Sequence, residues 1–97
     1  MTAVVIPFDE GERGLDWLDL TRALAAGHDL PRARVEDVFL YRDRDTLLNR
    51  SAWIDGMGVA VKAATVFPGN PAKGKQMIGG AVSLFSDGDG ALEAILD

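Results

Sequence analysis

One lysine in the middle of an apolar segment has the clearest chemical potential in this chain. Residues 58–67 predict a strand, in which alternate residues share a face, so that Lys62 lies on the same face as Ala60 and Ala64. Side chains this small leave room above the sheet for a ligand beside the ammonium group. A partly desolvated lysine at such a position requires a carboxylate, from another side chain or from a substrate. A solvated lysine on the wet face of a sheet is the more common case, so sequence alone leaves both interpretations open.

The segment directly after this strand has the composition of a rigid loop. Two prolines fix the backbone of residues 67–74, and two glycines permit turns that other residues do not make. A rigid loop that continues from the Lys62 strand suits one wall of a pocket, formed by Pro68, Gly69 and Asn70. The same residues also suit a long hairpin connection whose only role is geometric.

Other chemistries lack the residues that they need. The absence of cysteine excludes a thiol nucleophile, a thiolate metal site and a disulfide, and the single histidine, His28, excludes a His-rich metal site. Residues 56–58, Gly-Met-Gly, resemble the start of a dinucleotide fingerprint, but Val61 stands in place of its third glycine. Residues 87–90 are too short for a calcium loop. The adjacent glycines at 79–80 indicate a bulge or a close approach within a strand rather than a phosphate site.

The composition restricts the class of protein. Fifteen acidic residues against ten basic residues give a net charge of −5, which argues against a nucleic-acid partner. No apolar run approaches the roughly 20 residues of a membrane span, and the N-terminus lacks the basic-then-apolar pattern of a signal peptide. The length of 97 residues and the 47% apolar content fit one globular domain. We therefore expect a single cytoplasmic domain over residues 1–97, with no nucleic-acid or membrane partner.

The remaining patterns predict an α+β domain, with one main helix packed on an antiparallel sheet of about five to six strands. Trp17, Leu20 and Leu24 repeat at helical spacing, which predicts a helix over 16–26 with Asp16 as its N-cap and Gly27 as its stop. Residues 9–14 are charged and contain two glycines, which predicts a loop. Strands are expected over residues 3–7, 35–41, 46–54, 58–67, 76–85 and 91–96. Short turns between them favour antiparallel pairing.

Residues 58–74, GVAVKAATVFPGNPAKG, resemble the signature of the ornithine cyclodeaminase/mu-crystallin family. In that signature, G-V-K is followed by a few apolar residues, then by F-P-x-N and a glycine. The flanking residues 27–32 and 83–97 agree, so the resemblance covers nearly the whole chain. It implies an α+β substrate domain whose sheet pairs with its twin in a dimer. It also implies a separate Rossmann domain that binds NAD(H) or NADP(H), which is absent from these residues.

The resemblance also implies an activity and a site. Members of the family catalyse hydride chemistry at the α-carbon of an amino acid, such as conversion of ornithine to proline and ammonia, or reduction of cyclic ketimines. By position, Lys62 matches the lysine that holds the substrate carboxylate. Arg32 matches the arginine that clamps the same carboxylate, with Arg34 as an alternative. The implied protein is a homodimer that binds a small carboxylate-bearing amino or imino acid, and no NAD(H) is expected on this chain alone.

Departures from the family pattern leave the substrate open. Arg50-Ser51 stands where many members have Met-Pro, and Gln76-Met77 stands where many have Pro-Thr. The last strand ends at Asp97 without a turn or cap, which indicates a truncated chain or an edge completed by another element. Without the nucleotide domain and the catalytic aspartate of the family, this chain alone is expected to be inactive. Two alternatives stand beside half an enzyme: a self-standing dimeric binding module without catalysis, and a structural dimer in which Lys62 is a surface residue.

Overall fold

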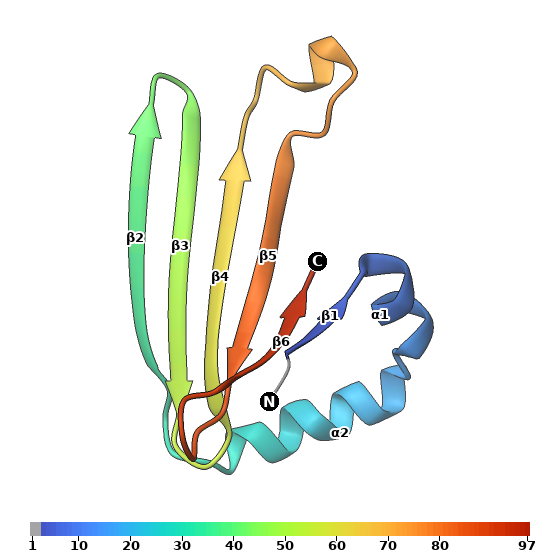
Figure 1. The fold of residues 1–97 in the computed structure, drawn as a ribbon, viewed down its shortest axis with the longest axis vertical. Coiled ribbons are helices and arrows are strands. Elements are labelled where there is room, and N and C mark those ends of the chain that lie inside the picture. The colour runs from blue at the N-terminus through green and yellow to red at the C-terminus, as the bar shows by residue number, and fades with distance from the viewer. Residues whose placement is uncertain (1–2) are drawn as a thin grey trace.

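The computed structural model describes residues 3–97 as a six-stranded sheet with two helices at one side of it (Figure 1). The α+β class and the predicted number of strands are therefore confirmed. The strands lie in the order β1-β6-β5-β4-β3-β2 across the sheet. Along the chain the elements are β1 (Val4–Ile6), α1 (Phe8–Gly14), α2 (Trp17–His28), β2 (Arg34–Arg42), β3 (Asp45–Ile54), β4 (Gly58–Val66), the 3-10 helix η1 (Pro71–Lys73), β5 (Ile78–Phe85) and β6 (Leu92–Leu96).

Strand direction agrees with the sequence prediction everywhere except at one edge. Strands β2 to β6 pair in antiparallel fashion, as short turns require. Strand β1 instead pairs with β6 in parallel, with Val5 opposite Ile95, so the prediction of a fully antiparallel sheet is wrong here. The chain returns beside β1 only after the two helices and four further strands, and a connection of that length permits a parallel pair.

The helices differ from the prediction in number and extent. Residues 9–14, predicted as a loop, belong to α1, where Asp9 and Glu10 lie in the first turn and Arg13 in the last. Those positions suit the helix dipole, which offsets the low helix propensity of the two glycines. In α2 the predicted cap is confirmed, because the Asp16 side chain accepts a hydrogen bond from the backbone N–H of Leu18 at 2.9 Å. The helix does not stop at Gly27 but ends one residue later.

The predicted packing of the main helix on the sheet is wrong. Figure 1 shows α2 leaving one end of the sheet and running away from the strands. Trp17 is 75% exposed and Leu24 is 59% exposed, so the residues that the structure describes leave most of the apolar stripe of the helix uncovered. The helical periodicity of the sequence predicts the apolar stripe, but it does not predict which residues pack against the stripe. Among the described residues, Ala64 in β4 is the single buried apolar side chain, and both faces of the sheet are largely open.

The connections gather at two ends of the sheet (Figure 1). The link from α2 to β2, the β3–β4 turn and the β5–β6 turn lie together at one end. We call this the helix end. The β2–β3 turn and the loop that contains η1 lie at the other, which we call the loop end. The strand β4 runs from the helix end to the loop end and carries Lys62 at its middle.

Candidate functional site

Lys62 lies at the centre of β4 with Arg50 of β3 and Val82 of β5 as its direct cross-strand partners. Directly paired residues project from the same face, with Cβ atoms about 4.5–5.5 Å apart, so Lys62 and Arg50 are neighbouring cations. We call this surface the Lys62 face. Ala60 and Ala64 precede and follow Lys62 on it, and Lys62 is exposed to solvent. The lysine therefore rises above a floor of small side chains, beside an arginine.

Arg50 is held in place by a carboxylate on its other side. Its Nε and Nη2 atoms donate to the two oxygens of Asp37 in β2, each at 2.7 Å, which is a bidentate ion pair. These hydrogen bonds, more than the charge of Arg50, lower the pKa of the Asp37 carboxyl group below its ordinary value. Asp37, Arg50 and Lys62 thus form one row across three strands. The sequence prediction missed this row, because only the β2–β3 register brings Asp37 opposite Arg50.

An apolar hollow of about 250 Å³ adjoins this row on the side of the helix end. Its lining includes Ala52, Ala60 and Leu84, each of which lies two positions along its strand from the row that contains Lys62. Glu93, at a register shift between β5 and β6, also lines the hollow and is exposed. The arrangement places two cations at one end of an apolar hollow and a carboxylate on its border. It suits a small molecule with an acidic group and an apolar body.

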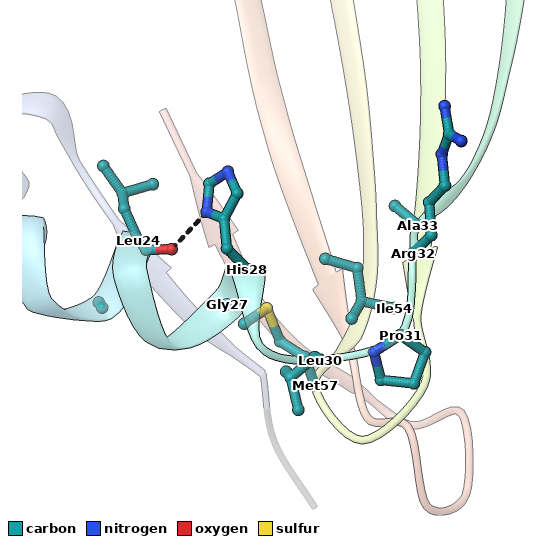
Figure 2. Close-up of a pocket in the computed structure, with 10 residues that line it drawn as sticks. Leu24, Gly27, His28, Leu30, Pro31, Arg32, Ala33, Ile54 and Met57 are labelled. Carbon is teal, nitrogen blue, oxygen red and sulfur yellow. Dashed lines mark hydrogen bonds between the residues drawn. The ribbon is translucent and has the colours of Figure 1, made fainter.

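Arg32 lies outside the sheet, in the link between α2 and β2. It lines a larger hollow of about 450 Å³ between the end of α2 and the β3–β4 turn, together with His28, Leu30 and Met57 (Figure 2). Figure 2 shows the Arg32 side chain pointing along the sheet, away from Leu30 and Met57. His28, the single histidine, is exposed at the last position of α2, where its Nδ1 atom lies 2.7 Å from the Leu24 carbonyl oxygen.

The structure does not bring Arg32 and Lys62 into contact. Arg34 pairs with Trp53, which pairs with Val59, so Lys62 is three positions further along and two strands across from Arg34. With a rise of about 3.3 Å per residue and strands about 4.8 Å apart, the two Cα atoms are about 14 Å apart. Arg32 precedes Arg34 and lies beyond the end of the strand. A shared carboxylate would therefore need a larger ligand or a change in the link that carries Arg32.

Arg34, the alternative arginine, projects from the face opposite to Lys62. Lys62 lies three positions after Val59, the residue that shares a face with Arg34, and an odd offset along a strand places it on the opposite face. The Arg34 guanidinium donates to Asp55 at 2.8 Å and lies 4.9 Å from the centre of the Trp53 ring. These contacts tie Arg34 to the β3–β4 turn and point it away from the row of cations.

A second carboxylate, Asp87, fastens the two turns at the helix end. Its two oxygens accept hydrogen bonds from Trp53 Nε1 and from the backbone N–H of Gly56, each at 2.8 Å. These two bonds, with that from Trp53 the larger, lower the pKa of the Asp87 carboxyl group, and the charge of Arg34 adds to the effect. Residues 87–90, excluded as a calcium loop, thus anchor a turn. Within residues 3–97 no group of three His, Cys, Asp or Glu side chains is arranged to hold a metal ion.

The predicted pocket loop lies at the loop end, opposite to Arg32. Asn70 organises it: the Nδ2 atom donates to the Gln76 carbonyl at 2.9 Å, and the Asn70 carbonyl accepts from the backbone N–H groups of Lys73 and Lys75. Gly74 closes the loop with a φ of 72°, which favours glycine. Val66, the last residue of β4, lies four positions after Lys62, or about 13 Å along the strand, so the later residues Pro68, Gly69 and Asn70 do not contact Lys62.

Residues 56–58 do not form a dinucleotide-binding turn. A dinucleotide fingerprint needs a glycine-rich turn between a strand and the N-terminus of a helix. Here residues 56–58 turn between the antiparallel strands β3 and β4, and no helix begins there. Gly58 has a φ of 146°, and an added Cβ would lie 2.9 Å from the Phe85 carbonyl oxygen, so this glycine serves a close approach between strands. No helix within residues 3–97 has the length and apolar character to cross a membrane.

Comparisons with known proteins identify the relatives of this chain. A Δ1-pyrroline-2-carboxylate reductase from Paracoccus denitrificans is 47% identical over 83 residues, which are 86% of this chain and 26% of the relative. The chain therefore spans about a quarter of the length of the curated relative that it matches. No family model matches the sequence.

Solved structures share the fold. An archaeal alanine dehydrogenase, described as a dimer with bound NAD, matches all of the chain and 31% of its own length, with a TM-score of 0.84 and 23% identity. A Δ1-pyrroline-2-carboxylate reductase from Thermococcus litoralis, in complex with NADH and L-proline, matches 96% of the chain and 31% of its own, with a TM-score of 0.80 and 16% identity. A lysine cyclodeaminase, described in terms of its recognition of L-lysine, L-ornithine and L-2,4-diaminobutyric acid, matches all of the chain and 33% of its own, with a TM-score of 0.63 and 23% identity.

These matches confirm the family resemblance found in the sequence. The chain is related over most of its length to part of a Δ1-pyrroline-2-carboxylate reductase, and its fold recurs in cyclodeaminase-like and alanine dehydrogenase structures.

Proposed function

We propose that this chain is the substrate-binding and dimerisation part of an ornithine cyclodeaminase-like protein. Its substrate would be a small amino or imino acid, processed by NAD(P)-dependent chemistry such as cyclodeamination or ketimine reduction. The carrying observation is Lys62, which rises beside Arg50 at the end of an apolar hollow on the Lys62 face. This cationic site belongs to a chain that is 47% identical to a pyrroline-2-carboxylate reductase.

The cofactor belongs, in this proposal, to a part of the protein outside these residues. The chain corresponds to 26–33% of the length of its relatives, and residues 56–58 do not fit a dinucleotide. The chain by itself then binds the substrate only weakly and has no activity. Its own residues supply orientation: a carboxylate fixed by cations leaves the α-carbon in one place, which shortens the search for the reacting geometry.

The exposed apolar surface supports dimerisation. Strand β2 is a nine-residue edge strand whose residues are all exposed, including Phe39 and Tyr41, whose rings stack with centroids 6.0 Å apart. An uncovered edge of this length is a ready partner for another chain. The archaeal alanine dehydrogenase that shares the fold is itself a dimer. A second copy of this chain against the sheet would bury surface that is open in the single chain.

Binding of L-proline, followed by NMR on the 97-residue chain, tests the carboxylate site. We expect weak binding that is lost in Lys62→Gln and retained in Lys75→Gln, which removes an exposed lysine from the loop end. Tight binding of NAD(H) to this chain would contradict the proposal that the substrate binds here and the cofactor binds to a part of the protein outside these residues. Proline binding that is the same in both variants would favour a surface role for Lys62.

Analytical ultracentrifugation tests the dimer. Phe39→Lys places a charge in the β2 edge and is expected to raise the dimer dissociation constant. Trp17→Lys is the matched control, because Trp17 is 75% exposed on α2 and remote from that edge. A dimer that dissociates with Trp17→Lys but not with Phe39→Lys would place the contact on the helix instead of the sheet.

A further inference from the structure

We propose that Arg50, locked by Asp37, is the second cation of the carboxylate site, and that the ligand carboxylate lies between Arg50 and Lys62. This inference rests on the proposed function and adds to it a specificity-determining pair.

The charges of Asp37, Arg50 and Lys62 favour binding of an anion between Arg50 and Lys62. Like charges that lie directly opposite each other on adjacent strands destabilise a sheet. Arg50 is compensated on its β2 side by Asp37. Within residues 3–97, Lys62 forms no ion pair, and its partner on the other side is the apolar Val82. A carboxylate between the two cations would complete an alternating row: Asp37, Arg50, ligand, Lys62.

Arg50 retains the donors that this role needs. A guanidinium has five N–H groups in a fixed fork, and the pair with Asp37 uses one from Nε and one from Nη2. Three N–H groups remain, two of them on Nη1. The bidentate grip of Asp37 fixes the plane of the guanidinium before a ligand arrives, which lowers the ordering cost of binding. Asp37 is therefore a positioning residue, and Arg50 and Lys62 are the groups that contact the ligand.

The neighbouring hollow restricts the class of ligand. Its volume of about 250 Å³ and its floor of Ala52, Ala60 and Leu84 admit a small apolar body directly beside the cations. The row Asp37, Arg50 and Lys62 carries one net positive charge, which one carboxylate neutralises. The class that fits is a small monocarboxylate with a compact aliphatic or five-membered ring. A second carboxylate on the ligand would lie in the apolar part of the hollow, near Glu93.

The test measures L-proline and L-prolinamide against four variants of the 97-residue chain by NMR titration. Arg50→Gln and Lys62→Gln are each expected to raise the dissociation constant of L-proline about two- to fivefold, because both cations are exposed and solvent screens their attraction to the ligand carboxylate. Prolinamide lacks the carboxylate, so neither substitution should change its binding. Arg50→Lys keeps the charge but not the fork, and an intermediate effect is expected. Arg42→Gln is the control, because Arg42 is an ion-paired arginine on the opposite face.

A direct readout separates ligand contact from a structural role. The Arg50 side-chain N–H signals, identified by their absence in Arg50→Lys, should shift on addition of L-proline and stay in place with prolinamide. Because Arg50→Gln leaves Asp37 without its partner, the double variant Asp37→Asn/Arg50→Gln provides a neutral pair. Its backbone spectrum reports whether the sheet is intact. In the intact double variant, the loss of proline affinity should match that of Arg50→Gln.

Each outcome decides the matter. Loss of proline affinity in Lys62→Gln but not in Arg50→Gln would overturn the Arg50 assignment and leave the proposed function standing. Equal loss for proline and prolinamide would show that Arg50 supports the fold and does not hold the carboxylate. A proline dissociation constant that does not change in Lys62→Gln, or no binding of proline to the unaltered chain, would refute the proposed function and this inference together. Matched, carboxylate-specific losses in both single variants would support it.

Discussion

Addition of one methyl group at Gly80 should destabilise the sheet beside the candidate site. Gly80 lies opposite Ala64, the one buried apolar residue among those described, on the Lys62 face. A Cβ atom at Gly80 would lie 2.7 Å from the Ala63 carbonyl oxygen and 3.1 Å from the Ala64 Cα atom. Both contacts are with the backbone of β4, which cannot rotate away as a side chain can. The strands would have to separate, and the floor next to Lys62 would move with them.

The expected loss in Gly80→Ala follows from two opposing terms. Overpacking costs about 1–3 kcal/mol, while replacement of glycine restricts the unfolded chain and returns about 0.4–1 kcal/mol. The net loss is about 1–2 kcal/mol in the free energy of unfolding. For a domain of this size, 1 kcal/mol corresponds to roughly 4–8 °C in Tm. Thermal and urea unfolding followed by circular dichroism would measure it.

The adjacent glycine provides the control. A Cβ atom at Gly79 would lie 3.4 Å from Thr65 Oγ1, which is a side-chain atom at an ordinary contact distance. Gly79→Ala should therefore leave the stability within about 0.5 kcal/mol of the original or raise it. Equal stability of Gly79→Ala and Gly80→Ala would refute the argument from close approach.

Three further outcomes follow from the structure. Hydrogen bonds from Trp53 and the backbone lower the pKa of Asp87, so the contribution of Asp87 to stability is complete above the ordinary carboxyl pKa of about 4 and is lost as pH falls through the folded-state value. In urea unfolding, the stability difference between the original chain and Asp87→Asn should therefore shrink from pH 6 to pH 2. A difference that stays constant over this range would contradict the prediction. Glu93→Gln should weaken binding of L-proline but not of tetrahydrofuran-2-carboxylate, which lacks the ring nitrogen, and equal weakening of both in NMR titrations would remove Glu93 from the site. Gly58→Ala should lower Tm, because Gly58 has a φ of 146° and a Cβ there would meet the Phe85 carbonyl oxygen at 2.9 Å; an unchanged melting curve would show that the strands relax.

Local signals in the sequence predicted local structure well. Asp16 was identified as a cap from its position before an apolar repeat, and the cap depends only on the next two residues. The strands β2 to β5 were located to within two residues at each end, because β-branched runs and turn residues mark them. The helix α1 was missed because two glycines hide a short segment whose charges suit a helix. A pattern of glycines alone does not separate a loop from a short helix.

Properties that depend on distant partners were not predictable in the same way. The parallel β1–β6 pair joins the two ends of the described chain, and no turn signal reports such a pairing. The alternation of side chains along a strand placed Lys62 on a face with small residues. Its cross-strand neighbour Arg50 could be identified only from the β3–β4 register. The family resemblance directed attention to Arg32 and Arg34. The structure places Arg32 at the helix end and Arg34 on the opposite face, and it places Arg50 beside Lys62.

The openness of the Lys62 face connects binding with assembly. In the single chain, Lys62 and Arg50 are exposed, so their attraction to a carboxylate acts largely through water. The attraction between two unit charges 4 Å apart is about four times stronger at the effective dielectric near a protein surface than in bulk water. A cover over the Lys62 face would exclude water from the row and strengthen the same contacts without any new residue. By linkage, a ligand that binds the covered state more tightly also favours the covering, so ligand affinity and association of the sheet with its partner should rise together.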